Sequence, residues 1–218
     1  AGRLLAVTQP TEFVALCDAT FPGNEQQLID WLEPHASLGE CDCLDVSADG
    51  RWIAAISLVN SKRTDVLILD TASKKLEWGF STTNRVTALA IAPDRPIVAI
   101  YGREARAIEL VDFQARTTLT RYEVDHGRTG SLAFSGDGRR LVSVGTDGAI
   151  RLWDGDLTGP PDTIQIAPTQ RSSVRELRFL ADQRHLLTAN SNGTAYLIRL
   201  EDWTSADPES QRDGDEVR

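Results

Sequence analysis

The chain has 218 residues, of which 41% are hydrophobic and 25% charged, a balance typical of a folded, water-soluble protein. No apolar stretch approaches the roughly 18–20 residues that a membrane span needs, so we expect no membrane partner. The formal net charge of −9 argues against a protein whose whole surface binds nucleic acid.

Cysteine and histidine usage gives no sign of a metal site. Cys17, Cys41 and Cys43 are an odd number at no metal-ligand spacing, and the three histidines are scattered along the chain. We therefore expect neither a metal nor another cofactor, and we interpret the cysteines as small buried apolar residues. Their usage favours a reducing compartment, and hence a cytoplasmic location.

In chain order, four turn-like segments recur at nearly constant spacing, with their aspartates at positions 49, 94, 137 and 182. An apolar strand is predicted before each turn, in the segments CLDVS, ALAIA, SLAFS and ELRFL. A second strand follows each turn, in RWIAAIS, RPIVAIY, RRLVSVG and RHLLTAN, and a third follows in DVLILD, AIELVD, AIRLWD and AYLIRL. A period of about 40–45 residues made of short strands is typical of radially repeated β-sheets.

This pattern divides the chain into five units. A partial unit is predicted at residues 1–36, with strands in GRLLAVT and FVALCD, and four more at 41–80, 86–124, 130–167 and 174–203. A fourth strand is predicted at KLEWGF, TTLTRYEV and TIQIA. The central strands are almost continuously apolar, as expected where neighbouring sheets cover both faces of a sheet.

One segment has a specific signature. Residues 131–154, SLAFSGDGRRLVSVGTDGAIRLWD, contain a Phe-Ser-x-Asp-Gly turn, an Asp-Gly hairpin and a final Trp153-Asp154 pair. This segment resembles the WD-repeat consensus, and the other units are degenerate but in register, so the resemblance covers about residues 1–203. It implies an all-β fold, namely a β-propeller of four-stranded antiparallel blades, present here as a partial ring of about five blades.

The resemblance also implies a buried hydrogen-bond network within a blade, formed by a His, a Ser or Thr, an Asp and the Trp. Ser143, Asp147 and Trp153 match three of these positions, and His126 is the candidate for the fourth. These residues are structural in the family rather than catalytic. A buried Asp needs charge-assisted hydrogen bonds to offset its desolvation, so replacing Asp147 by Ala is expected to destabilise the blade by a few (~3) kcal/mol.

The last unit and the chain ends differ from the best-matching unit. Thr188 and Asn192 match the network positions of the last unit, while Ile198 replaces the Trp. The first unit begins inside a turn, and the chain contains no Met, so we expect further blades upstream. The full ring would then have about seven or eight blades, with a closed five-blade ring as the alternative. Residues 204–218 are acidic and aperiodic and are predicted to be a disordered tail.

The repeat predicts which connections share a face. We name the four strands of each unit a, b, c and d in chain order. In a propeller the b–c connections and the d–a connections between units gather on one face, and the a–b and c–d connections on the other. Basic residues fall in the first group, and we predict that they bind an acidic or phosphorylated peptide of a partner protein. These residues are Arg85, Arg128, Arg171, Arg103 and Arg63. The alternative is that they are ordinary solvated arginines. The opposite face is predicted to be acidic, because turn-forming aspartates recur there.

Three functions fit this sequence. A non-enzymatic scaffold for protein–protein interaction is favoured, because no nucleophile elbow, phosphate loop or zinc-binding pair occurs in it. A propeller-type enzyme domain, quinoprotein-like or lactonase-like, is the alternative, but it needs polar groups around the central channel, and the innermost strands are mostly aliphatic. A regulatory sensor domain fused to an upstream catalytic module is the third.

Overall fold

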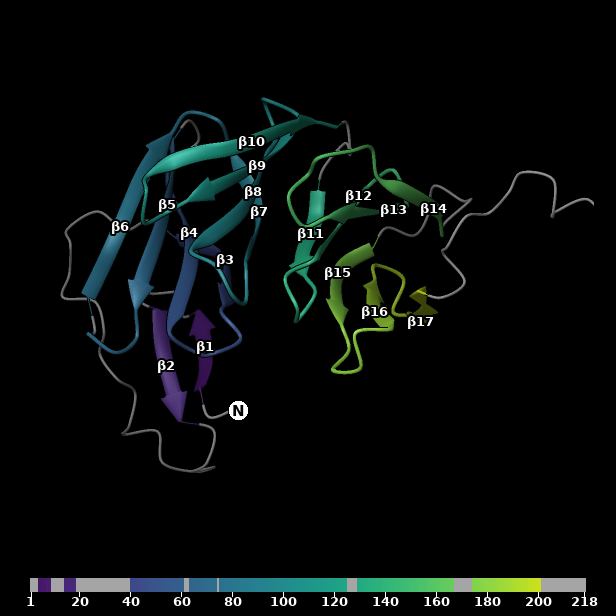
Figure 1. Cartoon of the computed structure of the whole chain (residues 1–218), viewed down its shortest axis with the longest axis horizontal. Coiled ribbons are helices and arrows are strands. Elements are labelled where there is room, and N and C mark those ends of the chain that lie inside the picture. Colours follow the sequence, from purple (N-terminus) through teal and green to yellow (C-terminus); the bar gives the residue numbers. More distant parts are fainter. Residues whose placement is uncertain are drawn as a thin grey trace, which may run out of the picture.

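The computed structural model describes residues 4–8, 14–18, 40–60, 63–73, 75–124, 129–166 and 174–200. These residues form antiparallel β-sheets whose strands are joined in chain order, as Figure 1 shows. The expected all-β propeller of four-stranded blades is confirmed by this arrangement. His126, Arg128, Arg171 and the predicted tail lie outside the described residues.

The strands follow one another with short connections. The first sheet is a pair, β1 (Leu4–Thr8) and β2 (Val14–Asp18). The second consists of β3 (Glu40–Val46), β4 (Trp52–Asn60), β5 (Arg63–Asp70) and β6 (Lys75–Thr82). The third consists of β7 (Val86–Ile91), β8 (Ile97–Gly102), β9 (Ala107–Asp112) and β10 (Thr117–Glu123). The fourth consists of β11 (Thr129–Phe134), β12 (Arg140–Gly145), β13 (Ala149–Asp154) and β14 (Asp162–Gln165). The last described sheet consists of β15 (Val174–Phe179), β16 (His185–Asn190) and β17 (Ala195–Arg199).

Successive sheets meet through their first strands. β3 lies against β7, β7 against β11, and β11 against β15. Figure 1 shows these four strands nearest the middle of the molecule, with β6, β10 and β14 on the outside. Side chains also join the inner strands directly, since the Asp45 carboxylate accepts a hydrogen bond from the Ile91 amide at 3.0 Å. The sheets are therefore arranged side by side around a common centre.

The hydrophobic core lies between the sheets, one layer for each neighbouring pair. In β8, Val98 and Ile100 pack toward the β3–β6 sheet, while Ile97 and Tyr101 pack toward the β11–β14 sheet. Successive side chains of a strand point to opposite faces, so a strand between two sheets must be apolar at every position. All six residues of β8 are buried. This double burial explains the continuous apolar runs in the sequence.

The connections lie at two ends of the sheets. We call the end with the β3–β4, β7–β8, β11–β12 and β15–β16 connections the turn face; the β5–β6, β9–β10 and β13–β14 connections lie there too. We call the opposite end, with the connections between sheets, the loop face. Gly50 and Gly138 have positive φ angles of 71° and 67° in turns of the turn face, a conformation that favours glycine.

Candidate functional site

The best-matching blade contains a buried polar contact. The Trp153 indole nitrogen donates a hydrogen bond to the Ser143 hydroxyl at 2.8 Å, and both side chains are fully buried. Tyr122 of the preceding sheet packs edge-on against the indole, with ring centroids 4.8 Å apart. The contact joins β12 and β13 of one sheet, within the hydrophobic layer between this sheet and the β7–β10 sheet.

Asp147 differs from its expected place in a buried network. It is exposed in the β12–β13 hairpin, where its carboxylate lies 2.7 Å from the guanidinium of Arg151. It also accepts a hydrogen bond from the Ala149 amide at 3.2 Å. The expected burial is wrong because the hairpin turn sits at the sheet end, where a carboxylate keeps contact with water while it caps the turn.

The last sheet has a related but weaker arrangement. Thr188 is fully buried, and its hydroxyl accepts a hydrogen bond from the Tyr196 amide at 3.2 Å. Asn192 is exposed, and its side-chain oxygen accepts hydrogen bonds from the amide and the hydroxyl of Thr194. Asn192 therefore stabilises the β16–β17 turn from outside the core. Ile198, which lies at the position of the Trp, is paired with Leu186 across the sheet.

The loop face has fewer available guanidinium groups than its sequence implies. Arg63 is held in place by its own strand pair, since it binds both oxygens of the Asp65 carboxylate and the Ser81 hydroxyl at 2.8 Å. The Arg85 Nε atom is buried and has no hydrogen-bond partner among the described residues. Its backbone amide donates to the Glu104 carboxylate, and its carbonyl accepts from the Arg103 amide at 2.9 Å. Arg85 and Arg103 are thus brought together, next to an acidic side chain.

Aspartate carboxylates of the turn face accept hydrogen bonds from residues of their own turns. Asp137 accepts hydrogen bonds from the Ser135 hydroxyl at 2.6 Å and the Arg139 amide at 3.1 Å. The hydroxyl contact holds the pKa of Asp137 below its usual value. Asp49 has the same contacts with Ser47 and Arg51, with the same effect on its pKa. These aspartates form turns, as the sequence predicts, and each accepts both of these hydrogen bonds through one carboxylate oxygen, Oδ1.

Arginines accompany these aspartates, so the predicted separation of charge between the two faces is wrong for the turn face. Each first turn of a sheet contains an arginine one or two residues after its aspartate, namely Arg51, Arg95, Arg139 and Arg184. The Arg51 guanidinium lies over the Trp52 ring, 4.6 Å from its centroid, and 3.5 Å from the Asp70 carboxylate. The turn face is therefore mixed in charge rather than acidic.

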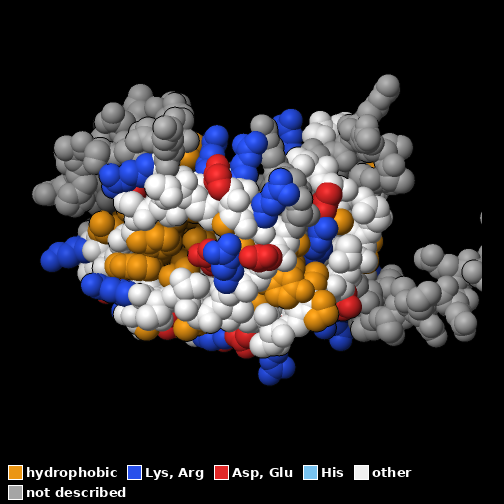
Figure 2. Space-filling view, turned by 90° about the horizontal axis from the view of Figure 1, so that it is seen from above, with side chains coloured by type: hydrophobic (Ala, Val, Ile, Leu, Met, Phe, Trp, Pro, Cys, Tyr) orange, Lys and Arg blue, Asp and Glu red, His pale blue; other side chains and the backbone are white. Residues whose placement is uncertain are grey.

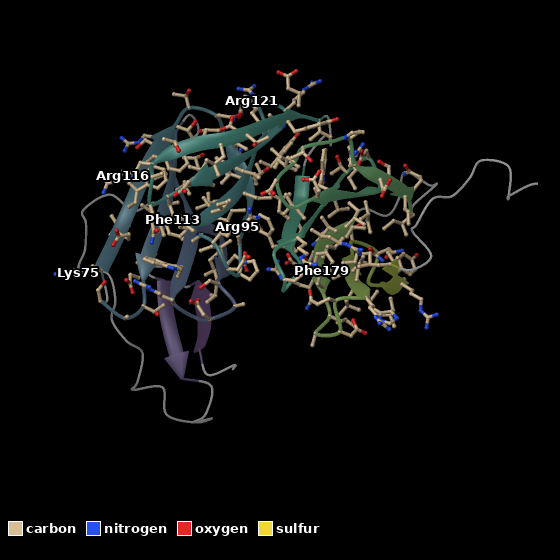
Figure 3. The ribbon with its side chains drawn as sticks, viewed as in Figure 1. Lys75, Arg95, Phe113, Arg116, Arg121 and Phe179 are labelled. Atoms are coloured by element: carbon tan, nitrogen blue, oxygen red, sulfur yellow. The ribbon has the colours of Figure 1, made fainter. Side chains whose placement is uncertain are left out.

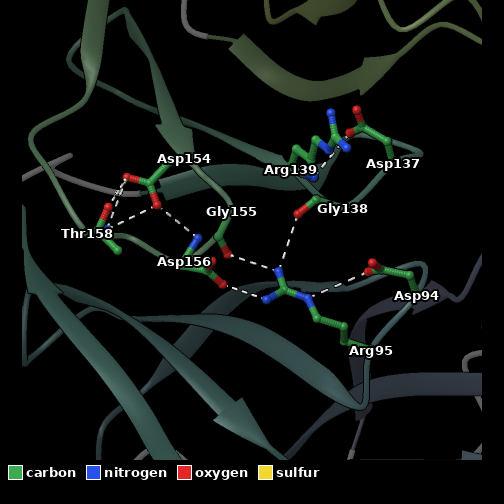
Figure 4. Close-up of polar contacts among 9 residues, drawn as sticks. All are labelled: Asp94, Arg95, Asp137, Gly138, Arg139, Asp154, Gly155, Asp156 and Thr158. Carbon is green, nitrogen blue, oxygen red and sulfur yellow. Dashed lines mark hydrogen bonds and ion pairs between the residues drawn. The ribbon is translucent and has the colours of Figure 1, made fainter.

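Arg95 joins two sheets (Figure 4). Its guanidinium reaches from the β7–β8 turn to the next sheet, where it binds the Asp156 carboxylate at 2.5 Å. It also donates to the carbonyls of Gly138 at 3.3 Å and Gly155 at 3.4 Å. Its donors are thus directed at protein acceptors, and four aspartates surround the hollow of about 630 Å³ in which it lies. Arg95 therefore connects two neighbouring sheets through these contacts, and its donors are not directed at a ligand site.

A second groove of about 330 Å³ lies on the other side of the same β11–β12 turn. It is lined by three arginines, from two neighbouring sheets, together with one aspartate: Arg139, Arg140, Arg184 and Asp137, with Ser135, Gln183 and Leu200 completing the wall. Within the part of the chain that the structure describes, no ion pair joins the guanidinium of Arg139 or Arg140 to a carboxylate. The lining of this groove thus contains three arginines and one aspartate, of which Arg139 and Asp137 also line the hollow around Arg95.

A smaller hollow of about 190 Å³ adjoins this groove at the ends of the inner strands. Apolar and polar groups share its walls: Ile91, Pro93, Ala133, Phe134 and Phe179 contribute apolar side chains, and Asp45, Arg178, Ser135 and Gln183 contribute polar ones. Figure 3 shows Phe179 on the β15 side of the middle of the molecule. Burial raises the pKa of the Asp45 carboxyl, against the hydrogen bond from Ile91 and the positive charge of Arg178.

These charged residues alter the expectation that the innermost strands are aliphatic. Asp45 and Cys43 lie on β3, and Glu176 and Arg178 lie on β15, where the two charged side chains of β15 pair at 2.9 Å. Burial raises the pKa of the Cys43 thiol. No group of three or more His, Cys, Asp or Glu side chains suited to a metal ion occurs among the described residues. Nor do these residues include a helix long and apolar enough to cross a membrane.

The outer side of the sheets is different in character. Figure 2 shows Lys and Arg side chains interspersed with Asp and Glu side chains and with hydrophobic groups on the side seen above β10. Arg121 of β10 lies within ion-pair distance of Glu109 at 3.7 Å and of Glu123 at 3.9 Å. Positive and negative groups alternate here, whereas three arginines and one aspartate line the groove at the β11–β12 turn.

Comparisons with known proteins agree with this geometry. A family model described as "WD domain, G-beta repeat" matches residues 118–154, which run from the outer strand β10 through β13. The chain is 25% identical over 121 residues to the target of rapamycin complex subunit wat1 of Schizosaccharomyces pombe, covering 56% of this chain and 36% of that protein. It is 26% identical over 150 residues to WD repeat-containing protein 1 of Xenopus tropicalis, covering 67% of this chain and 24% of that protein.

A solved structure shares the fold. Hydrazine synthase of Kuenenia stuttgartiensis superimposes with a TM-score of 0.62 at 16% sequence identity, over 76% of this chain and 47% of that one. At this identity the likeness concerns the fold alone. The two sequence relatives are longer proteins: the match covers about a third of the wat1 subunit and about a quarter of WD repeat-containing protein 1.

Proposed function

Because the chain is a WD-repeat β-propeller, we propose that it is a non-enzymatic scaffold that holds partner proteins through the ends of its sheets. One relative is by its name a subunit of a larger complex, which supports an interaction role. The observation that counts most is the distribution of charged groups. Turn aspartates such as Asp137 accept hydrogen bonds within their own turns, while arginines line a groove where the turns of two neighbouring sheets meet.

The ligand class follows from this chemistry. A guanidinium presents a planar fork of donors that matches a carboxylate or a phosphate with two parallel hydrogen bonds. A scaffold with such groups at its surface is suited to acidic or phosphorylated peptides of partner proteins. On the loop face, the groups proposed for this role are those placed there by the sequence, Arg85, Arg103, Arg128, Arg171 and Arg63. Of these, Arg63 is already paired with Asp65.

A variant test separates this role from a passive surface. The triple variant Arg85→Ala, Arg128→Ala and Arg171→Ala is compared with the unmodified protein for binding to the partner recovered by pull-down, across a series of salt concentrations. We expect the triple variant to bind more weakly and with a smaller dependence on salt, because fewer ion contacts form. Unchanged affinity together with salt-insensitive binding would remove the loop-face arginines from the interface. A purified protein that retains no partner protein at all would contradict the scaffold role.

A further inference from the structure

We propose that the turn face binds an extended peptide in which an apolar side chain lies close to a phosphorylated or acidic one. The acidic group occupies the groove lined by Arg139, Arg140 and Arg184, and the apolar side chain occupies the hollow beside Phe134 and Phe179. This proposal rests on the scaffold function, since the peptide belongs to a partner protein, but it concerns the face opposite to the one that the sequence predicts.

The anionic part of the site rests on Arg139 and Arg140, for which no ion pair with a carboxylate occurs among the described residues. Arg139 and Arg140 are exposed: Arg139 is the last residue of the β11–β12 turn, Arg140 is the first residue of β12, and both line the groove. Their backbone amides bind the β11–β12 turn, at Asp137 and at Ser135, while their guanidinium groups make no ion pair with a described carboxylate. The one carboxylate in the lining, Asp137, accepts two hydrogen bonds through Oδ1 and stays negatively charged, so the lining holds three guanidinium groups and one carboxylate.

The apolar part of the site adjoins the groove directly. Ser135 and Gln183 line both hollows, so one ligand can reach from the arginines to the aromatic rings without crossing the core. Phe134 and Phe179 are only partly buried, and their remaining exposed surface faces a space bounded by Pro93 and Ala133. A small hollow that combines aromatic and aliphatic side chains with a few polar groups is suited to hold one side chain of a peptide.

Gln183 holds the two neighbouring turns in a fixed relation. Its φ angle is +57°, in the conformation that Gly50 and Gly138 adopt in the equivalent turns, and such a backbone is costly for a residue with a side chain. Its side chain accepts a hydrogen bond from the Gly136 amide of the adjacent turn and donates to the Leu180 carbonyl at 3.1 Å. The floor between the two hollows is therefore preorganised, which lowers the entropic cost of binding.

The neighbouring Arg95 hollow does not fit the same ligand. The Arg95 guanidinium already contacts two carboxylates, of Asp156 and Asp94, and two backbone carbonyls, and the hollow also contains Asp154. Hydrogen bonds from Thr158, Asp156 and Gly159 outweigh the effect of burial and hold the pKa of Asp154 below its usual value, so this carboxylate stays charged. Four aspartates and two arginines line this hollow, so an anionic peptide is disfavoured there relative to the groove with three arginines and one aspartate.

The test uses degenerate peptide pools on the immobilised full chain. The first pool has a fixed phosphoserine and a leucine or phenylalanine at one of the few positions before or after it, with all other positions varied. Two matched pools have glutamate or serine in place of phosphoserine, and another has alanine in place of the apolar residue. We expect the phosphoserine or the glutamate pool to be retained in preference to the serine pool, and the better of the two identifies the anionic group. Equal retention of all pools overturns the proposal.

Variants then locate the site. Arg139→Ala with Arg140→Ala is expected to weaken binding by about ten-fold for each charge-assisted hydrogen bond removed. Arg121→Ala, which removes an exposed positive charge on outer strand β10, is the matched control and is expected to bind as the unmodified protein. Ala48→Trp, at an exposed position of the hollow, is expected to weaken the apolar pools and to leave the alanine pool unchanged.

The variants also separate this proposal from the scaffold function. Binding that is lost in the loop-face triple variant and kept in Arg139→Ala with Arg140→Ala refutes the groove and leaves the scaffold in place. Binding that is lost in the double variant and kept in the triple variant supports the groove. Circular dichroism of each variant must match the unmodified protein, and Arg139→Lys with Arg140→Lys should restore part of the binding by keeping the charge.

Discussion

The buried contact between Trp153 and Ser143 provides the most sharply defined energetic test of the fold. Ser143→Ala removes the acceptor and leaves the indole N–H in a region without water, since both side chains are fully buried. A stranded buried donor costs about 1–3 kcal/mol, and the lost hydroxyl opens very little space, so we expect a loss of about 2 kcal/mol. Trp153→Phe removes the donor as well as indole volume and is expected to cost about 3 kcal/mol.

Urea unfolding followed by far-ultraviolet circular dichroism measures these changes, because the other four tryptophans complicate fluorescence. The double variant should cost less than the sum of the two single variants by about 1 kcal/mol, since the contact can be lost only once. Asp147→Ala is the comparison. Its side chain is exposed and paired with Arg151, so we expect a loss of about 1 kcal/mol, less than for Ser143→Ala. Additive single variants, or a Ser143→Ala protein as stable as the unmodified one, would refute the contact.

Two further predictions follow from the inter-sheet contacts. Arg95→Lys is expected to lower the free energy of unfolding by about 1 kcal/mol, because an ammonium cannot reach Asp156 and the two carbonyls together. An unchanged midpoint of urea unfolding would show that these contacts of Arg95 do not stabilise the protein. Asp45→Asn is expected to stabilise the protein at neutral pH, since burial raises the pKa of Asp45 above its unfolded value while an amide oxygen can still accept the Ile91 hydrogen bond. The unmodified protein gains stability as pH falls through this raised pKa, because its folded state takes up the proton first, so the advantage of the variant should shrink in acid. A difference between the two proteins that does not change with pH would contradict this account.

The architecture could be predicted because it repeats locally. Strand alternation and turn spacing appear in every unit, and the continuous apolar run in β8 reports that both of its faces are covered. The pairing of Ser143 with Trp153 follows from the same repeat, since hairpin register brings β12 and β13 together. The placement of Asp147 did not follow, because a position in a repeat does not specify how far its side chain extends into water.

The candidate site depends on how the ends of different sheets come together, and no local pattern records this. Arg95 reaches Asp156 across 61 positions of the chain, and Gln183 reaches Gly136 across 47. The arginines of the turn face were visible in the sequence beside their aspartates. Whether their guanidinium groups can bind a ligand does not follow from the sequence, because it depends on which carboxylate oxygens accept hydrogen bonds within the turns. Asp45, Glu176 and Arg178 near the centre were likewise concealed within strands that are otherwise apolar.

Amide hydrogen exchange with and without the best-retained peptide tests most directly whether a rigid core presents charged turns to a partner. The account predicts slower exchange at residues 135–140 and 180–184, with unchanged exchange in the buried strands β7, β8 and β9. Slower exchange throughout those strands, or none at either turn, would contradict it.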